Sequence, residues 1–230
     1  MRLDQFIATS SELSRKEAKR AIAAGDVQVN GDVWKNSATA VPANAEVMLQ
    51  GAPVALPGEH YLMLNKPAGY ISATRDSDQP TALDLLPAEL ARNLHIAGRL
   101  DADTTGLLLL TSDGQWSHRV TSPRVECPKT YQVALSEPIS QVAISALETG
   151  VMLRNDTKPT KAAQVKVLHS QLIELTISEG RYHQVKRMIA AVGNHVTTLH
   201  RSRIGGVTLD PALAAGEHRF LTSAEIASFT

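Results

Sequence analysis

Hydrophobic residues in this chain form short blocks, some spaced as in strands and others as in helices. Four consecutive leucines, Leu107 to Leu110, are bounded by turn residues, which is typical of a strand buried on both faces. An amphipathic helix is predicted by apolar residues at i, i+3, i+4 and i+7, namely Val185, Met188, Ile189 and Val192. Both elements are expected in a packed core.

The region after residue 57 alternates between strand and helix patterns. Strands are predicted at 60–64, 107–110, 130–135, 163–168, 172–177 and 196–199, and helices at 88–94, 116–120, 138–148 and 185–192. Thr222 and Glu225 form the capping box of a last short helix. The strands at 163–168 and 172–177 are expected to form a hairpin. We therefore expect a mixed α+β body rather than a doubly wound sheet.

The first 57 residues have helix and hairpin signals of their own. A capping box that begins at Ser14 starts a predicted helix, which ends near Gly25. Residues 27–29 alternate as a strand, and Asn30 and Gly31 are a strong signal for a two-residue hairpin turn. These elements predict a small, separate module.

Proline and glycine near residue 57 predict a linker between two domains. Pro53, Pro57 and Gly58 lie close together there. A length of 230 residues suits one large or two modest domains. We therefore expect domains at 1–57 and 58–230.

Composition narrows the class of protein. The 23 basic and 23 acidic side chains cancel, so net charge gives no indication of a partner. Cys127 is the one cysteine, so no intramolecular disulfide can form, which fits a reducing compartment. Neither a secretory leader nor a run of about 20 apolar residues is present. We expect a soluble, cytoplasmic monomer that does not act at a membrane.

Two clusters of cations indicate a polyanionic partner. Four lie on the predicted helix of the first module, and three of them lie in its first turn and a half, where the helix dipole makes cations mildly unfavourable: Arg15, Lys16, Lys19 and Arg20. Five more lie in a stretch without acidic residues that extends to residue 209: Arg181, Lys186, Arg187, Arg201 and Arg203. Contacts with nucleic-acid phosphates would explain both clusters. A solvated polar face is the alternative for the helix.

The turn before the leucine strand carries Arg99, Asp101 and Asp103. Such a cluster at the mouth of a buried strand is either a satisfied structural turn or a functional site. A calcium-binding EF-hand loop is disfavoured, because Thr105 and Ser112 occupy its fifth and twelfth positions. The chain also lacks the glycine-rich motifs that bind phosphates.

Metal binding and thiol catalysis find no support in the sequence. The histidines between residues 183 and 200 lack the spacing of metal ligands, so we expect no metal. Cys127 lies outside any signature of a catalytic thiol, which favours a structural role.

Four motifs occur together and in order. They are LNKPAGY at 64–70, GRLDADTTGLLLLTSDG at 98–114, KTY at 129–131 and EGRYHQVKRM at 179–188. With these motifs the body resembles the pseudouridine synthases, and more narrowly the RsuA-type branch that acts on small-subunit ribosomal RNA. The first module, with its basic helix and GDVQVNG at 25–31, resembles the RNA-binding S4 module named after ribosomal protein S-four.

The resemblance implies an α+β catalytic body with a mixed, largely antiparallel sheet and a central cleft. It implies isomerisation of a uridine to pseudouridine in 16S rRNA, presented as naked RNA or in a small-subunit assembly particle. The target base would be flipped into the cleft. No cofactor is expected, because the reaction needs neither a redox step nor an external group.

The matching motifs also imply roles for individual residues. Asp101 matches the catalytic aspartate, Arg99 the arginine that helps to displace the base, and Tyr131 the tyrosine against the uracil. Arg181 matches the basic residue that pairs with the aspartate. Lys66 belongs to a motif near the cleft and is expected to bind the substrate or RNA. The remaining cations of both clusters are expected to contact RNA: Arg15, Lys16, Lys19, Arg20, Lys186, Arg187, Arg201 and Arg203.

Each of these residues has a structural alternative when it is taken alone. Tyr131 would suit a half-buried strand, Arg181 a solvated helix start, and Arg99 a structural ion pair. Asp103 is expected to be a turn residue bonded to its own backbone.

Two classes of function stay open at this point. The first is the enzyme, and the second is a non-catalytic RNA-binding or ribosome-assembly factor. The intact Asp101 favours the enzyme, and a nearby arginine would keep it ionised. The carboxylate could attack the ribose carbon, attack carbon 6 of the base, or deprotonate the ribose.

Overall fold

The computed structural model describes residues 1–42, 45–54 and 58–229. The chain divides into two compact units, Met1–Glu59 and His60–Thr230, which are described separately. The linker was expected around residue 57, next to this division. Pro57 itself lies outside the described residues.

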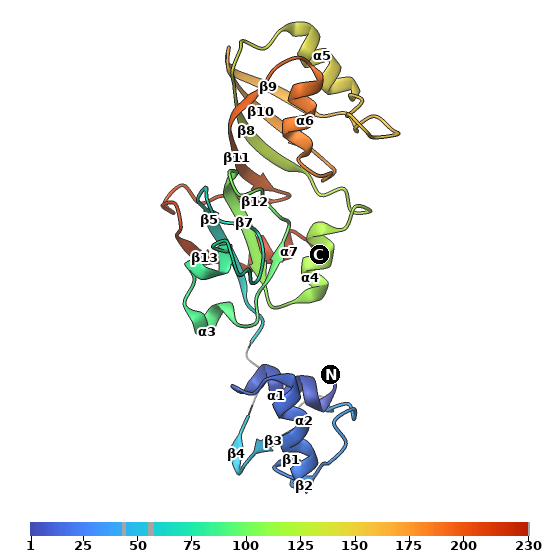
Figure 1. Ribbon diagram of the computed structural model, residues 1–230, viewed down its shortest axis with the longest axis vertical. Coiled ribbons are helices and arrows are strands. Elements are labelled where there is room, and N and C mark those ends of the chain that lie inside the picture. The colour runs from blue at the N-terminus through green and yellow to red at the C-terminus, as the bar shows by residue number, and fades with distance from the viewer. Residues whose placement is uncertain (43–44, 55–57, 230) are drawn as a thin grey trace. The chain divides into compact units, whose positions relative to one another are not determined.

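The first unit combines two helices with a four-stranded antiparallel sheet of order β2-β1-β3-β4 (Figure 1). Its elements are α1 (Leu3–Ser10), α2 (Arg15–Ala24), β1 (Val27–Val29), β2 (Asp32–Val33), β3 (Val47–Leu49) and β4 (Ala52–Pro53). The capping box at Ser14 is confirmed, and Gly25 ends α2 in the left-handed region at φ 91°. Asn30 and Gly31 have φ 51° and 87°, as their predicted hairpin turn requires. Pro53 belongs to β4 and not to a linker, which corrects that prediction.

The second unit is built on a nine-stranded sheet of order β13-β5-β7-β11-β8-β10-β9, with β6 and β12 paired to β7 and β11. Its strands are β5 (Tyr61–Lys66), β6 (His95–Ala97), β7 (Thr105–Thr111), β8 (Lys129–Leu135), β9 (Gln164–His169), β10 (Leu172–Ile177), β11 (Val196–Ile204), β12 (Val207–Thr208) and β13 (His218–Phe220). The β7–β11 pair is parallel, and the other described pairs are antiparallel. The predicted α+β class with a mixed, largely antiparallel sheet is confirmed.

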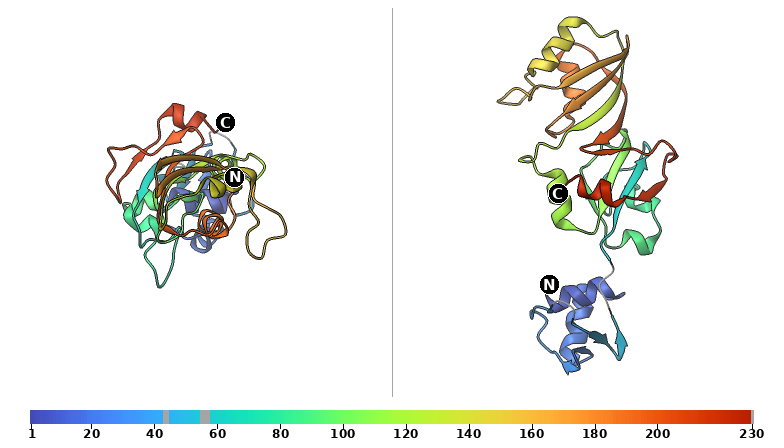
Figure 2. Two further views of the ribbon diagram at one scale, coloured as in Figure 1. Left: turned by 90° about the horizontal axis from the view of Figure 1, so that it is seen from above. Right: turned by 180° about the vertical axis from the view of Figure 1, so that it is seen from behind.

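Helices cover both faces of this sheet. They are the 3-10 helix η1 (Ala82–Leu85), α3 (Ala88–Ala91), α4 (Gly114–Thr121), α5 (Gln141–Thr149), α6 (Gln184–Ala191) and α7 (Ser223–Ala227). In Figure 1, α5 and α6 lie near β8, β9 and β10. The view from behind in Figure 2 shows α7 beside α4, where Trp116 donates to the carbonyl of Ile226 at 3.1 Å.

One helix begins later than its sequence predicts. The pattern places the start near Pro138, but α5 begins at Gln141. Ser140 takes the N-cap position, where its hydroxyl accepts a hydrogen bond from the backbone of Ala143. A side-chain cap satisfies a free helix N–H, so Ser140 sets the boundary.

β7 lies inside the sheet and is buried on both faces, as predicted. Leu108 and Leu110 pack into one core cluster with residues of α5 and α6. Leu107 and Leu109 pack into a second cluster with Trp116 of α4. All four leucines have no exposed surface. The turn that precedes β7 is therefore joined to a rigid element.

Gly106 allows the two parts of the large sheet to join. It pairs with Arg201 where β7 and β11 run in parallel, and its φ is 101°. A β-carbon there would overlap the carbonyl oxygen of Arg201 and would lie 2.8 Å from its backbone nitrogen. Only glycine suits both the close approach and the left-handed conformation.

Candidate active site

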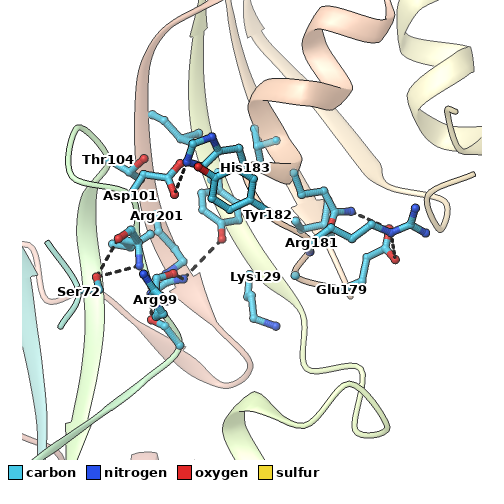
Figure 3. A pocket seen from close by; sticks show the side chains of 18 of the residues that line it. Ser72, Arg99, Asp101, Thr104, Lys129, Glu179, Arg181, Tyr182, His183 and Arg201 are labelled. Atoms are coloured by element: carbon cyan, nitrogen blue, oxygen red, sulfur yellow. Dashed lines mark hydrogen bonds and ion pairs between the residues drawn. The ribbon is translucent and has the colours of Figure 1, made fainter. Parts of the chain in front are cut away.

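The second unit contains a cavity of about 730 Å³ beside the charged turn. Its walls come from the turn 98–104, from β8 and β11, and from the segment 177–186 that leads into α6. Figure 3 shows the side chains that line it. Several residues predicted for the site meet there: Arg99, Asp101, Tyr131, Arg181, Lys186 and Arg201.

Asp101 faces two nitrogen groups at the cavity. Lys186 Nζ lies 3.2 Å from Oδ2, and His183 Nε2 lies 3.4 Å from Oδ1. The side chain of Asp101 keeps 29% of its surface exposed. The carboxylate is therefore both next to a cation and open to a substrate.

Lys186 bridges the two acids of the turn. Its Nζ donates to Asp103 at 2.6 Å in addition to its contact with Asp101. Burial lowers the pKa of Lys186, but the bonds to Asp103 and Asp101 outweigh this and raise that pKa. The bond from Lys186 in turn lowers the pKa of Asp103. Lys186, expected to contact RNA, is thus the basic partner of Asp101, and Asp103 helps to hold it.

The predicted pairing of Arg181 with Asp101 is wrong. The guanidinium of Arg181 donates to Asp156 at 2.9 Å and to two carbonyl groups of the loop 154–161. The reason is its place in the chain, because Arg181 precedes α6 and extends to that loop. Lys186 lies within α6 and extends to the charged turn instead.

Arg187 and Arg203 differ in how far they are engaged inside the protein. Arg187 shares Asp156 with Arg181, at 2.5 Å, and donates to the carbonyl of Arg154 at 2.6 Å. Its charge is therefore largely compensated. Arg203 is exposed and donates to the carbonyl of Gly205 at 2.8 Å.

Tyr131 and Arg99 occupy the wall and the rim of the cavity. Tyr131 is 8% exposed on β8. The guanidinium carbon of Arg201 lies 5.9 Å from the centre of the Tyr131 ring. Arg99 is exposed, and it lines the cavity (Figure 3). The expected contacts of Tyr131 with uracil and of Arg99 with the displaced base stay predictions.

Arg201 is a clamp on the charged turn, so its predicted contact with RNA is wrong. It is 1% exposed. It donates to the carbonyls of Gly98 at 2.9 Å, Arg99 at 3.2 Å and Leu107 at 2.9 Å. A side chain that is buried and directed at backbone carbonyls in this way is not exposed to an RNA phosphate.

Lys66 clamps the far end of the same turn, and its predicted contact with RNA is also wrong. It has no exposed surface. Its Nζ donates to three carbonyls, including those of Ala102 at 3.2 Å and Thr104 at 2.8 Å. Burial lowers its pKa to about 8, although Asp103 and Asp101 act in the opposite direction.

Ser72 and His183 are site residues that sequence reasoning missed. The hydroxyl of Ser72 donates to the carbonyl of Leu100 at 2.8 Å and accepts from its N–H at 2.9 Å. Ser72 lies outside the predicted strands and helices and outside the four motifs, so the sequence gave no signal for it. His183 had one signal, its place three residues before Lys186 in the last motif. Together with Lys66 and Arg201, Ser72 holds the backbone around Asp101 in place and so preorganises the carboxylate.

Comparison with known proteins now identifies the family. The model for RNA pseudouridylate synthase matches residues 60–191, more than half of the chain. The chain belongs to the RNA pseudouridylate synthase family. The model for the S4 domain matches residues 1–47 of this synthase. Both resemblances drawn from the motifs are confirmed, and so is the prediction of a pseudouridine synthase.

Relatives of this synthase match along the whole chain. "Ribosomal small subunit pseudouridine synthase A" of Escherichia coli K12 is 52% identical over 229 residues, 99% of each chain. The protein of the same name from Haemophilus influenzae is 47% identical over 227 residues, 98% of each chain. A crystal structure of a pseudouridylate synthase is 45% identical, with a TM-score of 0.74 over 100% of both chains.

In the S4 domain of the synthase, half of the basic cluster on α2 contacts a buried acid. Arg15 lies 3.2 Å and Lys19 3.8 Å from the carboxylate of Asp4, which has no exposed surface. Burial alone would raise the pKa of Asp4, but hydrogen bonds from Arg2 and Arg15 lower it to about 2. All four members of the cluster are exposed, so Lys16 and Arg20 share this property with Arg15 and Lys19.

Other chemistries receive no support from the described part of the chain. It holds no group of three or more His, Cys, Asp or Glu residues that could bind a metal ion. None of its helices has the length and apolar character needed to span a membrane. Burial raises the pKa of the Cys127 thiol, although Lys129 lowers it, and a raised pKa opposes a nucleophilic role.

Proposed function

We propose that this synthase isomerises one uridine to pseudouridine in 16S rRNA, with Asp101 as the reacting carboxylate. The observation that carries the proposal is an accessible carboxylate at a cavity, beside Lys186 and on a clamped turn. Identity of 52% with a small-subunit synthase along the whole chain supports the substrate class.

The reaction is an intramolecular exchange of bonds. The bond between ribose carbon 1′ and base nitrogen 1 breaks, the base rotates, and carbon 1′ joins carbon 5. Carbon 5 then loses its proton, and nitrogen 1 gains one. Atoms and electrons balance without a redox partner, so the chemistry itself requires no cofactor.

Asp101 suits the first step of this exchange. An ionised carboxylate can attack carbon 1′, attack carbon 6 of the base, or remove a proton from the ribose. Lys186 places a positive charge 3.2 Å from it, and the clamped turn fixes its direction. Fixed geometry of a reacting group contributes strongly to rate.

The cavity is expected to receive the target base after it leaves the RNA stack. Base flipping costs a few kcal/mol. The Tyr131 ring on the cavity wall offers a face that offsets part of this cost by stacking. Arg99, exposed at the rim, would then occupy the space that the base leaves.

Cations outside the cavity would hold the RNA backbone. In the S4 domain these are Arg15, Lys16, Lys19 and Arg20, and in the second unit Arg203. Such contacts position RNA without reading its sequence. We assign RNA docking to residues 1–57 and catalysis to residues 58–230. All the groups invoked come from one chain, so a monomer suffices.

Tritium release from small-subunit RNA labelled at uridine carbon 5 tests the proposal, because the reaction expels that hydrogen. The wild type, Asp101→Asn and Asp103→Asn would be compared. Both acids contact Lys186, so Asp103→Asn is a matched control for the loss of one charge. We expect Asp101→Asn to slow release by about 1,000-fold or more, and Asp103→Asn to keep most of the activity.

Two outcomes would decide against parts of the proposal. Full activity of Asp101→Asn would refute the assigned carboxylate. If the wild type binds the RNA tightly but releases no tritium from naked RNA or from an assembly particle, the competing non-catalytic assembly factor is favoured.

A further inference from the structure

Tyr182 is a large aromatic residue left open to solvent at the cavity. It is 77% exposed, and it lines the cavity together with His183. Figure 3 shows both rings close to Asp101. An exposed ring adds little to the core, so its position beside the reacting carboxylate points to a ligand.

The ring of Tyr182 is stacked on the ring of His183. Their centres are 3.8 Å apart, and their planes differ by 22°. One face of Tyr182 is therefore covered, and its high exposure leaves the other face open. His183 itself lies 3.4 Å from Asp101, so the stack extends outward from the carboxylate.

The backbone under this stack is held in an unusual conformation. His183 has φ 47°, in the left-handed region that residues other than glycine seldom adopt. The carbonyl of Tyr182 accepts a hydrogen bond from Arg187 at 3.3 Å, and Arg187 is itself bound to Asp156. Strained and well-anchored backbone is concentrated at functional sites. A pre-positioned ring loses little entropy when it binds.

We propose that Tyr182, supported by His183, is a stacking platform for a nucleobase next to the target uridine. The inference rests on the function proposed above, because it places the target nucleotide at Asp101. When the uridine flips out, the flanking bases lose a stacking neighbour. An open aromatic face one ring away from the carboxylate replaces that neighbour. Every base has a π face, so the platform positions RNA without selecting its sequence.

Three variants test the platform: Tyr182→Ala, Tyr182→Trp and Phe220→Ala. Phe220 is a matched control, since it is an aromatic residue 55% exposed on β13 and does not line the cavity. We expect Tyr182→Ala to lower kcat/KM for tritium release about 5- to 150-fold, the loss of one base–aromatic stack. Tyr182→Trp should restore at least half of the wild-type value, and Phe220→Ala should match the wild type.

A fluorescent base separates stacking from a merely structural role. The base 2-aminopurine would be placed on each side of the uridine whose tritium is released. We expect the wild type and Tyr182→Trp to quench it on one side, and Tyr182→Ala to leave it bright. Unchanged quenching and kcat/KM in Tyr182→Ala would overturn the platform. An equal loss of kcat/KM in Tyr182→Trp and Tyr182→Ala would overturn it too.

Failure of the proposed function would give a different result. In that case the wild type itself would release no tritium. The platform would then be judged by RNA affinity in filter binding, where Tyr182→Ala must weaken binding and Phe220→Ala must not. Equal affinities would overturn the platform as well.

Discussion

Replacing Lys66 by methionine tests whether a buried cation holds the catalytic turn. Lys66 has no exposed surface, and methionine is an unbranched, adaptable side chain that can fill the same space. The change removes three hydrogen bonds from Nζ to carbonyl groups, at 2.9, 3.2 and 2.8 Å. Two of these carbonyls, those of Ala102 and Thr104, follow Asp101 in the turn.

Two opposing contributions determine the stability of this variant. Burial lowers the pKa of Lys66 from 10.5 to about 8, a penalty on the charged form of about 3 kcal/mol, which methionine removes. Against this, each hydrogen bond to a charged group contributes about 1.5–3 kcal/mol. Losing three of them outweighs the gain, so we expect the free energy of unfolding to fall by about 2–5 kcal/mol.

The rate should fall independently of this loss of stability. A displacement of the reacting group by about 1 Å can cost about 100-fold in rate. We therefore expect kcat for tritium release by Lys66→Met to fall about 100-fold with KM little changed, at a temperature where the variant is folded. The control is Ile173→Ala in β10, which creates a cavity and should lower the free energy of unfolding by about 2–5 kcal/mol while leaving the turn intact. A folded Lys66→Met enzyme with wild-type kcat would refute the clamp.

The lowered pKa of Lys66 also predicts a dependence on pH. Between the folded pKa of about 8 and the ordinary lysine pKa of 10.5, the unfolded chain binds more protons than the folded one. The contribution of Lys66 to stability therefore rises with pH across this window. Over the same window Nζ loses one of its three N–H donors, so kcat should fall with an apparent pKa near 8. A wild-type kcat that is constant through this window would contradict the assignment.

Two further predictions concern the sheet junction and the S4 domain. Gly106→Ala should lower the free energy of unfolding by about 2 kcal/mol or more, because a β-carbon meets the backbone of β11 at a positive φ. Denaturant unfolding measures this, with Gly114→Ala as the control, since a β-carbon there meets nothing within 4 Å; equal midpoints would contradict the close approach. The double variant Lys16→Ala/Arg20→Ala should reduce the slope of log affinity for RNA against log salt by about 1.5–2. An unchanged slope between 50 and 200 mM salt, measured by filter binding, would mean that these exposed residues form only a solvated face.

Local elements could be predicted where spacing, capping and turn chemistry agreed. The capping box at Ser14 and the hairpin turn at Asn30 and Gly31 are decided by neighbouring residues, so the sequence contains the whole cause. The same holds for the leucines of β7, whose burial follows from an unbroken apolar run. Asp101 was selected because a motif placed it directly before that strand.

The buried cations could not be predicted, because their acceptors lie far away in the sequence. Arg201 donates to carbonyls 94 to 103 residues distant, and Lys66 to carbonyls up to 38 residues distant. From the sequence alone, a cation in a basic or motif-rich stretch is interpreted as a phosphate contact. The carbonyl groups that accept its hydrogen bonds are brought next to it only by the fold. The same limit led to the choice of Arg181 over Lys186, since the partner of each depends on which loop faces α6.

Lys66 and Arg201 are buried cations next to a turn that carries two acids. Both donate to carbonyl groups, and within the described residues no carboxylate lies within 4 Å of either cation. The charges of Asp103 and Asp101 nevertheless act on Lys66, because they raise its pKa against the effect of burial. Coulomb interactions are reciprocal, so the buried cation also stabilises negative charge on the turn. Lys66→Met removes both the clamp and this charge. The pH profile of kcat, rather than thermal stability, is therefore the measurement that distinguishes a role of Lys66 in catalysis from a role in folding alone.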